Sequence, residues 1–211
     1  MQRGFMVLAC ILLITAPAAA QWVGMPVWNS PKGGTGIGLY ADYGSGNDDA
    51  GNGTTYGLRG SAGFGNIMVT LGYTSADADL GNDNNNSFGG NVAFRVIGGS
   101  LMPVAVNIQG GAARIGEANG VSAFTRGTLG GGVSASLPLP LSIEPYFSLT
   151  NRWYIVDGSG DESNLGWTLG ANASFGMFGA HLAYDSESLD GGTAGVFGLG
   201  VHVSLRMPGG M

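Results

Sequence analysis

The feature that most constrains the fold of this chain is a strict alternation of apolar and polar residues between residues 56 and 73. Every second residue of 56–64 belongs to a row of Tyr, Leu, Gly, Ala and Phe, and the alternation resumes over 67–73. Gly65-Asn66 stands between the two rows and supplies the φ > 0 conformations that a two-residue hairpin turn needs. Because successive side chains of a strand point to opposite faces, this pattern predicts two paired antiparallel strands.

The same alternation recurs along the chain and predicts ten strands. They cover about residues 35–43, 56–64, 67–73, 87–97, 101–113, 123–137, 142–155, 165–175, 178–185 and 194–205. Four short turns alternate with five polar loops, at residues 44–53, 75–86, 114–121, 157–164 and 186–193. This arrangement is typical of outer-membrane barrels, whose short turns lie on the periplasmic side. We therefore predict an all-β fold: a ten-stranded antiparallel up-and-down transmembrane β-barrel over residues 34–206, with eight strands as the fallback.

The composition favours a lipid-facing exterior over a water-facing one. Charged residues make up 10% of the chain, whereas a soluble surface usually carries roughly 25–35%. The expected polar rows consist mainly of Gly, Ser, Thr and Asn, and Lys32 is the only lysine. No charged residue interrupts the apolar rows, and after residue 20 no run approaches the ~20 apolar residues of a spanning helix. A soluble barrel with its apolar side inside is the alternative.

Aromatic residues gather toward the ends of the expected strands. The expected girdle near the long loops consists of Tyr43, Tyr56, Tyr73, Trp153, Trp167 and Tyr184. Since Tyr and Trp are enriched at membrane–water boundaries, this banding favours the membrane barrel.

Residues 1–20 have the pattern of a signal peptide, with Arg3 at its basic start and small residues up to a cleavage site near Ala20. We expect a periplasmic arm at 21–33 and a short tail at 207–211. Cys10 is the only cysteine and leaves with the signal peptide, so no thiol or disulfide is expected afterwards. Loss of Arg3 reduces the 8 basic residues to 7 against 14 acidic ones, a net charge of −7 that argues against nucleic acid as a partner.

The whole-chain pattern, with segments such as Pro145-Tyr146-Phe147-Ser148-Leu149, resembles the small bacterial outer-membrane β-barrel proteins of the OmpA-like and porin-like group. The resemblance implies a non-enzymatic outer-membrane barrel, either structural or a narrow porin-like pore for small solutes or ions. Its expected partners are outer-membrane lipid, lipopolysaccharide and the barrel insertion machinery. Two features differ: that group's best-known barrels have eight strands, and many of its chains end in an aromatic residue, whereas this chain ends in Met211.

The inner face of the expected barrel carries four positive and three negative residues. These lumen-lining residues are Asp42, Arg59, Arg95, Arg126, Glu144, Arg152 and Asp185. Opposite charges that face each other across a small barrel could pair and close it. The neutral inward positions are rich in glycine, which favours either a narrow water path or strand curvature.

Other functions remain as alternatives. A surface recognition or adhesion barrel would act through its acidic loops, where weak binding of divalent cations by carboxylate oxygens is left open. These loop carboxylates are Asp48, Asp49, Asp77, Asp79, Asp83, Asp157, Asp161, Glu162, Glu187 and Asp190. An outer-membrane hydrolase would use His181 or His202. Residues 32–36 resemble the start of a phosphate-binding loop, but the Lys-Ser/Thr that should follow is absent. We predict no catalytic, cofactor or metal residues and leave the oligomeric state open.

Overall fold

The computed structural model describes residues 30–77, 84–98, 102–118, 120–137, 141–156 and 162–206. Ten strands lie in these ranges: β1 (Gly36–Gly46), β2 (Thr54–Phe64), β3 (Ile67–Asp77), β4 (Asn85–Ile97), β5 (Val104–Ile115), β6 (Phe124–Ala135), β7 (Ser142–Val156), β8 (Glu162–Phe175), β9 (Phe178–Leu189) and β10 (Gly192–Arg206). One 3-10 turn, η1 (Asp48–Ala50), joins β1 to β2. The predicted ten strands are confirmed, and the eight-stranded fallback is not needed. The expected signal peptide, the 21–29 part of the arm and the tail lie outside the described residues.

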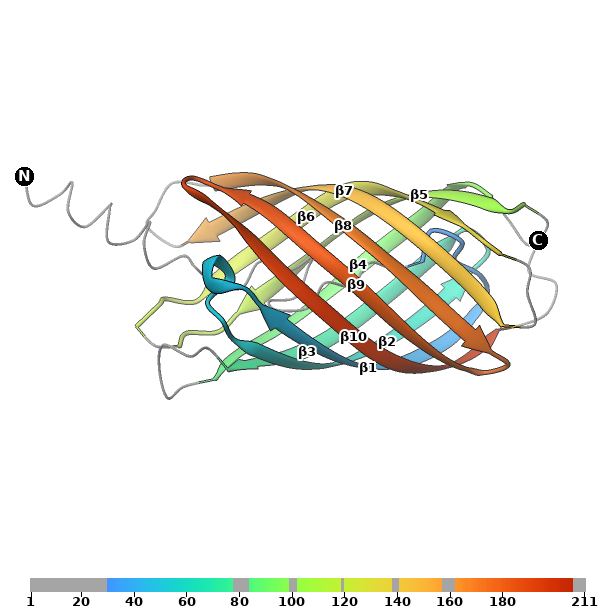
Figure 1. Cartoon of the computed structure of the whole chain (residues 1–211), viewed down its shortest axis with the longest axis horizontal. Coiled ribbons are helices and arrows are strands. Elements are labelled where there is room, and N and C mark those ends of the chain that lie inside the picture. Colours follow the sequence, from blue (N-terminus) through green and yellow to red (C-terminus); the bar gives the residue numbers. More distant parts are fainter. Residues whose placement is uncertain are drawn as a thin grey trace, which may run out of the picture.

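Each strand pairs antiparallel with its sequence neighbours, and β1 pairs with β10 to close the barrel. The closing ladder runs without interruption from Gly36 opposite Arg206 to Gly46 opposite Val196. The strands lie obliquely to the long axis (Figure 1). Closure pairs the backbone of every strand on both sides. It therefore leaves no open edge, whose unpaired N–H and C=O groups would promote aggregation in water and be costly in lipid.

The two faces of the barrel differ in chemistry, as the alternation predicts. Large apolar side chains point outward: Leu39 is 72% exposed and Phe64 is 83% exposed. Polar side chains such as Thr70 and Ser148 point inward and are fully buried. This is the reverse of a soluble barrel, so the alternative with the apolar side inside is wrong. No helix in the described part of the chain is long and apolar enough to cross a membrane.

The two ends of the barrel are distinguished by their connections. One end, called here the loop end, carries η1 and lies at the left of Figure 1. The other, called the turn end, carries the tight turns Gly65-Asn66 and Gly176-Met177. Gly65 and Gly176 both have positive φ, the backbone conformation for which these turns require glycine.

One predicted loop is wrong. We expected a polar loop at 186–193, but β9 continues to Leu189 and β10 begins at Gly192, so that only a tight turn separates them. Gly191 supplies the positive φ of this turn. Ser-Glu-Ser has the composition of a loop, yet its backbone pairs with β10 and its glutamate points into the barrel. The strict alternation of long and short connections therefore fails at this hairpin.

Candidate functional site in the barrel interior

The structure places all seven expected lumen residues on the inner face, each at most 8% exposed: Asp42, Arg59, Arg95, Arg126, Glu144, Arg152 and Asp185. They form three layers of polar contacts stacked from the loop end to the turn end, and each layer joins residues of different strands.

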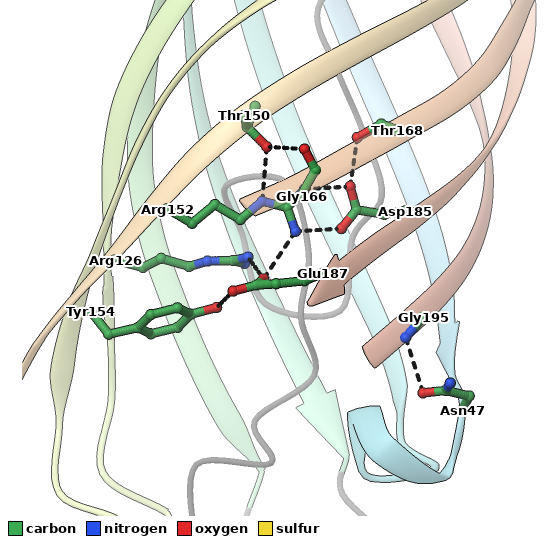
Figure 2. A network of polar contacts seen from close by, with 10 residues as sticks. All are labelled: Asn47, Arg126, Thr150, Arg152, Tyr154, Gly166, Thr168, Asp185, Glu187 and Gly195. Atoms are coloured by element: carbon green, nitrogen blue, oxygen red, sulfur yellow. Dashed lines mark hydrogen bonds and ion pairs between the residues drawn. The ribbon is translucent and has the colours of Figure 1, made fainter. Parts of the chain in front are cut away.

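The layer nearest the loop end is centred on Arg152 of β7 (Figure 2). Its Nη2 lies 2.8 Å from Asp185 Oδ1, and its Nη1 lies 2.9 Å from Asp185 Oδ2. The same Nη1 donates to Glu187 Oε2 at 2.9 Å, and Arg152 Nε donates to Thr150 Oγ1 at 2.9 Å. Both carboxylates belong to β9, so one guanidinium from β7 reaches past β8 to hold two acidic side chains of β9.

Arg126 and Tyr154 complete this layer from β6 and β7. Arg126 Nη2 lies 2.6 Å from Glu187 Oε2, and the Tyr154 hydroxyl donates to Glu187 Oε1 at 2.7 Å. The Arg126 guanidinium also lies over the Tyr154 ring, 5.3 Å from its centroid. Two arginines thus face two carboxylates, so the layer is electrically balanced, as a buried charge cluster must be to offset its desolvation.

Apolar side chains fill the interior between this layer and the loop end. A buried cluster joins inward-facing residues of four strands: Ala76, Ala113, Ile115, Phe124 and Tyr154. A second buried cluster places Ala50 of η1 against Ala194 and Val196. η1 is fixed in this position because Asn47 Oδ1 accepts a hydrogen bond from Gly195 N at 3.0 Å (Figure 2). Asn47 Nδ2 also donates to Thr193 O at 3.1 Å.

The middle layer brings together both histidines of the chain. Asp42 of β1 binds Arg59 of β2, with Arg59 Nε 2.7 Å from Asp42 Oδ2, and lies 2.6 Å from His181 Nε2 through Oδ1. The Arg59 guanidinium lies over the Tyr40 ring, 4.5 Å from its centroid. The rings of His181 and His202 are nearly parallel, with centroids 5.9 Å apart.

Interior glycines lie beneath these large side chains. A Cβ at Gly200 would lie 2.6 Å from His181 Nε2, and one at Gly170 would lie 2.5 Å from the Tyr146 ring. A Cβ at Gly166 would meet the Arg152 guanidinium. The sequence left open a water path or strand curvature as the reason for these glycines. The structure gives a third reason for Gly166, Gly170 and Gly200: each makes room for an inward side chain of a neighbouring strand.

The layer at the turn end is centred on Glu144 and Arg95. Glu144 accepts from Ser134 Oγ at 2.6 Å and from Ser30 Oγ at 2.7 Å, and Arg95 Nη1 donates to the Lys32 carbonyl at 2.6 Å. A cavity of about 50 Å³ separates this layer from the middle one. A cavity of that volume holds only a few water molecules.

All six expected girdle residues lie on the outer face: Tyr43, Tyr56, Tyr73, Trp153, Trp167 and Tyr184. Tyr43 and Tyr56 are in edge-to-face contact, with ring centroids 5.4 Å apart, and those of Trp167 and Tyr184 are 5.7 Å apart.

Sequence reasoning missed Glu187 and Tyr154. The sequence pattern places Glu187 among the acidic residues of a polar loop, whereas it is fully buried and bound by Arg126 and Arg152. Both residues could have been found by extending the inward rows by two positions, from Asp185 to Glu187 and from Arg152 to Tyr154. Among the described residues, no three His, Cys, Asp or Glu side chains lie close enough to hold a metal ion. Asp79, Asp83, Asp157 and Asp161 lie outside the described residues.

Comparison with known proteins gives fold likeness alone. No protein-family model matches the chain, and no curated protein matches it. Among solved structures, the N-terminal β-barrel domain of Pseudomonas aeruginosa OprF is 12% identical, with a TM-score of 0.41, and the match covers 82% of this chain and 99% of that one. The β domain of the Bordetella autotransporter Brka is 14% identical, with a TM-score of 0.49 and coverage of 82% and 100%. Neisserial surface protein A is 11% identical, with a TM-score of 0.35 and coverage of 81% and 95%. These are bacterial outer-membrane β-barrels, and at such values the likeness carries no information about role.

Proposed function

We propose that this protein is a non-enzymatic outer-membrane barrel whose interior is closed, so that its role is structural rather than that of an open pore. The observation that carries the proposal is the buried network in which Arg152 and Arg126 hold Asp185 and Glu187. A solute crossing the barrel would have to separate these charges in a site from which water is excluded. Separating a buried pair is costly because each charge is left without its partner.

The exterior supports the membrane location. Its exposed apolar side chains stand in rows on all ten strands, for example Leu39, Leu71, Phe94, Leu169 and Val201. A contiguous apolar surface around a whole barrel is far larger than the patches that soluble monomers expose. Lipid acyl chains fit this surface. We propose that the loop end, with η1, faces the cell exterior and lipopolysaccharide, that the turn end faces the periplasm, and that the barrel insertion machinery places the chain there.

The alternative of an enzyme using His181 or His202 has less support. His181 Nε2 is engaged by Asp42, and the cavity next to both histidines is small, about 50 Å³. The alternative of a recognition barrel rests on exposed acidic residues at the loop end. Asp48 and Asp49 of η1 are exposed, although Asp49 Oδ2 already accepts a hydrogen bond from Thr193 N at 3.1 Å.

A liposome-swelling assay tests the closed barrel. Liposomes that contain the folded protein are diluted into iso-osmotic solutions of small sugars and amino acids. The proposal predicts swelling no faster than in protein-free liposomes. Swelling that falls with increasing solute size would instead show a narrow pore, which is the second form of the expected function.

A further inference from the structure

The segment of residues 30–35, which precedes β1, is not explained by a closed structural barrel. It contains part of the Lys-Gly-Gly-Thr-Gly run that resembles a phosphate-binding loop in sequence. In the structure this segment runs against the inner wall at the turn end, where Pro31 is buried. We call residues 30–35 the strap.

Glu144 of β7 holds the first part of the strap. Ser30 Oγ lies 2.7 Å from both carboxylate oxygens of Glu144, and the Lys32 amide donates to Oε1 at 3.3 Å. Ser134 of the neighbouring β6 donates to the same carboxylate at 2.6 Å and so fixes its position. Hydrogen bonds to an ionised carboxylate are stronger than those between neutral groups, so Glu144 is the main anchor on this side.

Arg95 of β4 holds the strap from another part of the wall. Its Nη1 donates to the Lys32 carbonyl at 2.6 Å, and its Nη2 donates to Asn66 Oδ1 at 2.6 Å. The β4–β5 ladder shifts register between Arg95 and Ile97, which marks a bulge beside this side chain. Thr35 Oγ1 at the end of the strap accepts from Gly65 N at 3.0 Å. The strap is thus attached to strands three places apart in the barrel.

Glycines set the path of the strap. Gly33 and Gly34 have φ of +56° and +138°, values that residues with a side chain rarely adopt. Gly33 N donates to Ser30 O at 3.0 Å and so closes a turn. A Cβ at Gly63 of β2 would collide with the Gly34 carbonyl, so the wall is also shaped for the strap. The glycines of the run that resembles a phosphate loop therefore serve this turn.

The strap forms one wall of the 50 Å³ cavity. Ser30, Gly33, Gly34 and Thr35 line it on one side, while the other side is lined by the middle layer, including Tyr40, Arg59, His181 and His202. We propose that the strap is a gate: Glu144 and Arg95 latch it across the turn end, and its release opens the histidine-lined cavity to water and small ions from that side. This inference goes beyond the closed barrel, because the network at the loop end stays shut when the strap opens.

Thiol accessibility tests the gate. His202, which lines the cavity and is 7% exposed, is replaced in H202C as the reporter, in a C10A background that removes the only native cysteine. The full chain is expressed in the outer membrane, extracted in detergent, and reacted with a small charged methanethiosulfonate. Folding of every variant is checked by its heat-modifiable gel mobility.

Two variants weaken the latch without touching the cavity wall opposite the strap. Glu144→Gln removes the charge of the anchor, and Ser30→Ala removes the hydroxyl of the strap that Glu144 binds. Glu162→Gln, at an exposed position of β8, is the matched control for the loss of one carboxylate. The gate predicts that Glu144→Gln raises the labelling rate of the reporter about tenfold, the change that corresponds to loss of one charged hydrogen bond. Ser30→Ala should raise it by a smaller factor.

The outcomes separate cleanly. Faster labelling in both latch variants, with the Glu162→Gln rate unchanged, supports the gate. Equal labelling rates in all folded variants overturn the gate. The gate is also overturned if H202C, with the strap and Glu144 unchanged, already reacts as fast as a cysteine placed at the exposed position of Asp48. None of these outcomes depends on whether the barrel conducts ions.

Discussion

Arg152 and Asp185 face each other inside the barrel through two hydrogen bonds, of 2.8 and 2.9 Å, that join the two nitrogens of one guanidinium to the two oxygens of one carboxylate. Thr168 Oγ1 donates to the same carboxylate, and both side chains of the pair are fully buried. This two-pronged geometry fixes the orientation of both groups as well as their distance. It ties β7 to β9 across β8 and is the centre of the polar layer nearest the loop end.

Removing one member of this pair should destabilise the barrel strongly. In Asp185→Ala, the Arg152 charge stays buried with half of its acceptors lost, and we expect the free energy of unfolding to fall by about 3–5 kcal/mol. Urea unfolding in lipid vesicles, followed by tryptophan fluorescence, measures this change. The control is Asp48→Ala on exposed η1, which should change stability by no more than about 0.5 kcal/mol. Similar losses in the two variants would contradict the structural role of the pair.

Adding one methyl group at an interior glycine should destabilise the barrel. In Gly170→Ala the new Cβ would lie 2.5 Å from the Tyr146 ring, and we expect a loss of about 1–3 kcal/mol from overpacking. Gly60→Ala on the outer face is the matched control, because its Cβ would lie 3.8 Å from Leu39, an ordinary contact. Unfolding curves of the two variants in the same lipid provide the comparison. A Gly170→Ala barrel as stable as the Gly60→Ala barrel would mean that the interior has room to spare.

A charged residue introduced in the middle of the outer face should destabilise the barrel more than one introduced at the loop end. Leu71 lies outward near the middle of β3 and is 55% exposed, so Leu71→Arg should cost about 2–4 kcal/mol if that face lies in hydrocarbon. Asp48→Arg at the loop end introduces the same side chain outside the apolar rows and should cost little. Folding yield into vesicles and urea unfolding give the two values. If Leu71→Arg folds as readily as Asp48→Arg, the apolar face does not contact lipid.

The η1 cap should depend on Asn47. Its side chain both accepts from Ala50 N and Gly195 N and donates to the Thr193 carbonyl. Asn47→Ala removes these three side-chain hydrogen bonds, although Ala50 N still donates to the residue-47 carbonyl at 2.9 Å. We expect the free energy of unfolding to fall by about 1–2 kcal/mol, in the range of lost helix caps. Faster hydrogen exchange at the Ala50 and Gly195 amides, measured by NMR in micelles, should accompany it. Unchanged exchange at both amides would show that the cap does not need Asn47.

The period-two pattern was sufficient to predict the ten-stranded barrel and to predict that the seven charged residues assigned to the lumen point inward. A residue such as Arg152 is placed by its register alone, because each step along a strand reverses the face. The same rule failed at Glu187, where a polar Ser-Glu-Ser sequence is equally compatible with a loop and only pairing with β10 decides. It could not predict Ile115 and Phe124, two apolar residues that point inward, since apolar residues were expected on the outer rows.

Contacts between segments that are distant in the chain could not be predicted from the sequence pattern. Asp42 and His181 are 139 positions apart, and nothing in either strand alone indicates that closure of β1 on β10 brings them within 2.6 Å. Gly33 and Gly34 of the strap resemble part of a phosphate-binding loop in sequence. Their role in the turn could not be predicted, because the strands that the strap contacts are distant in the sequence. The roles of glycine beneath Arg152, His181 and Tyr146 likewise depend on which residues the register sets opposite each other.

Single-channel conductance in a planar lipid bilayer tests the closed interior most directly. The folded chain is added to a bilayer at high salt, with insertion verified separately by heat-modifiable mobility and protease resistance in vesicles of the same lipid. The closed network predicts no discrete current steps from the unaltered protein. Regular, reproducible steps, with a reversal potential in a salt gradient, would contradict it and show that ions pass the layer held by Arg126, Arg152, Asp185 and Glu187.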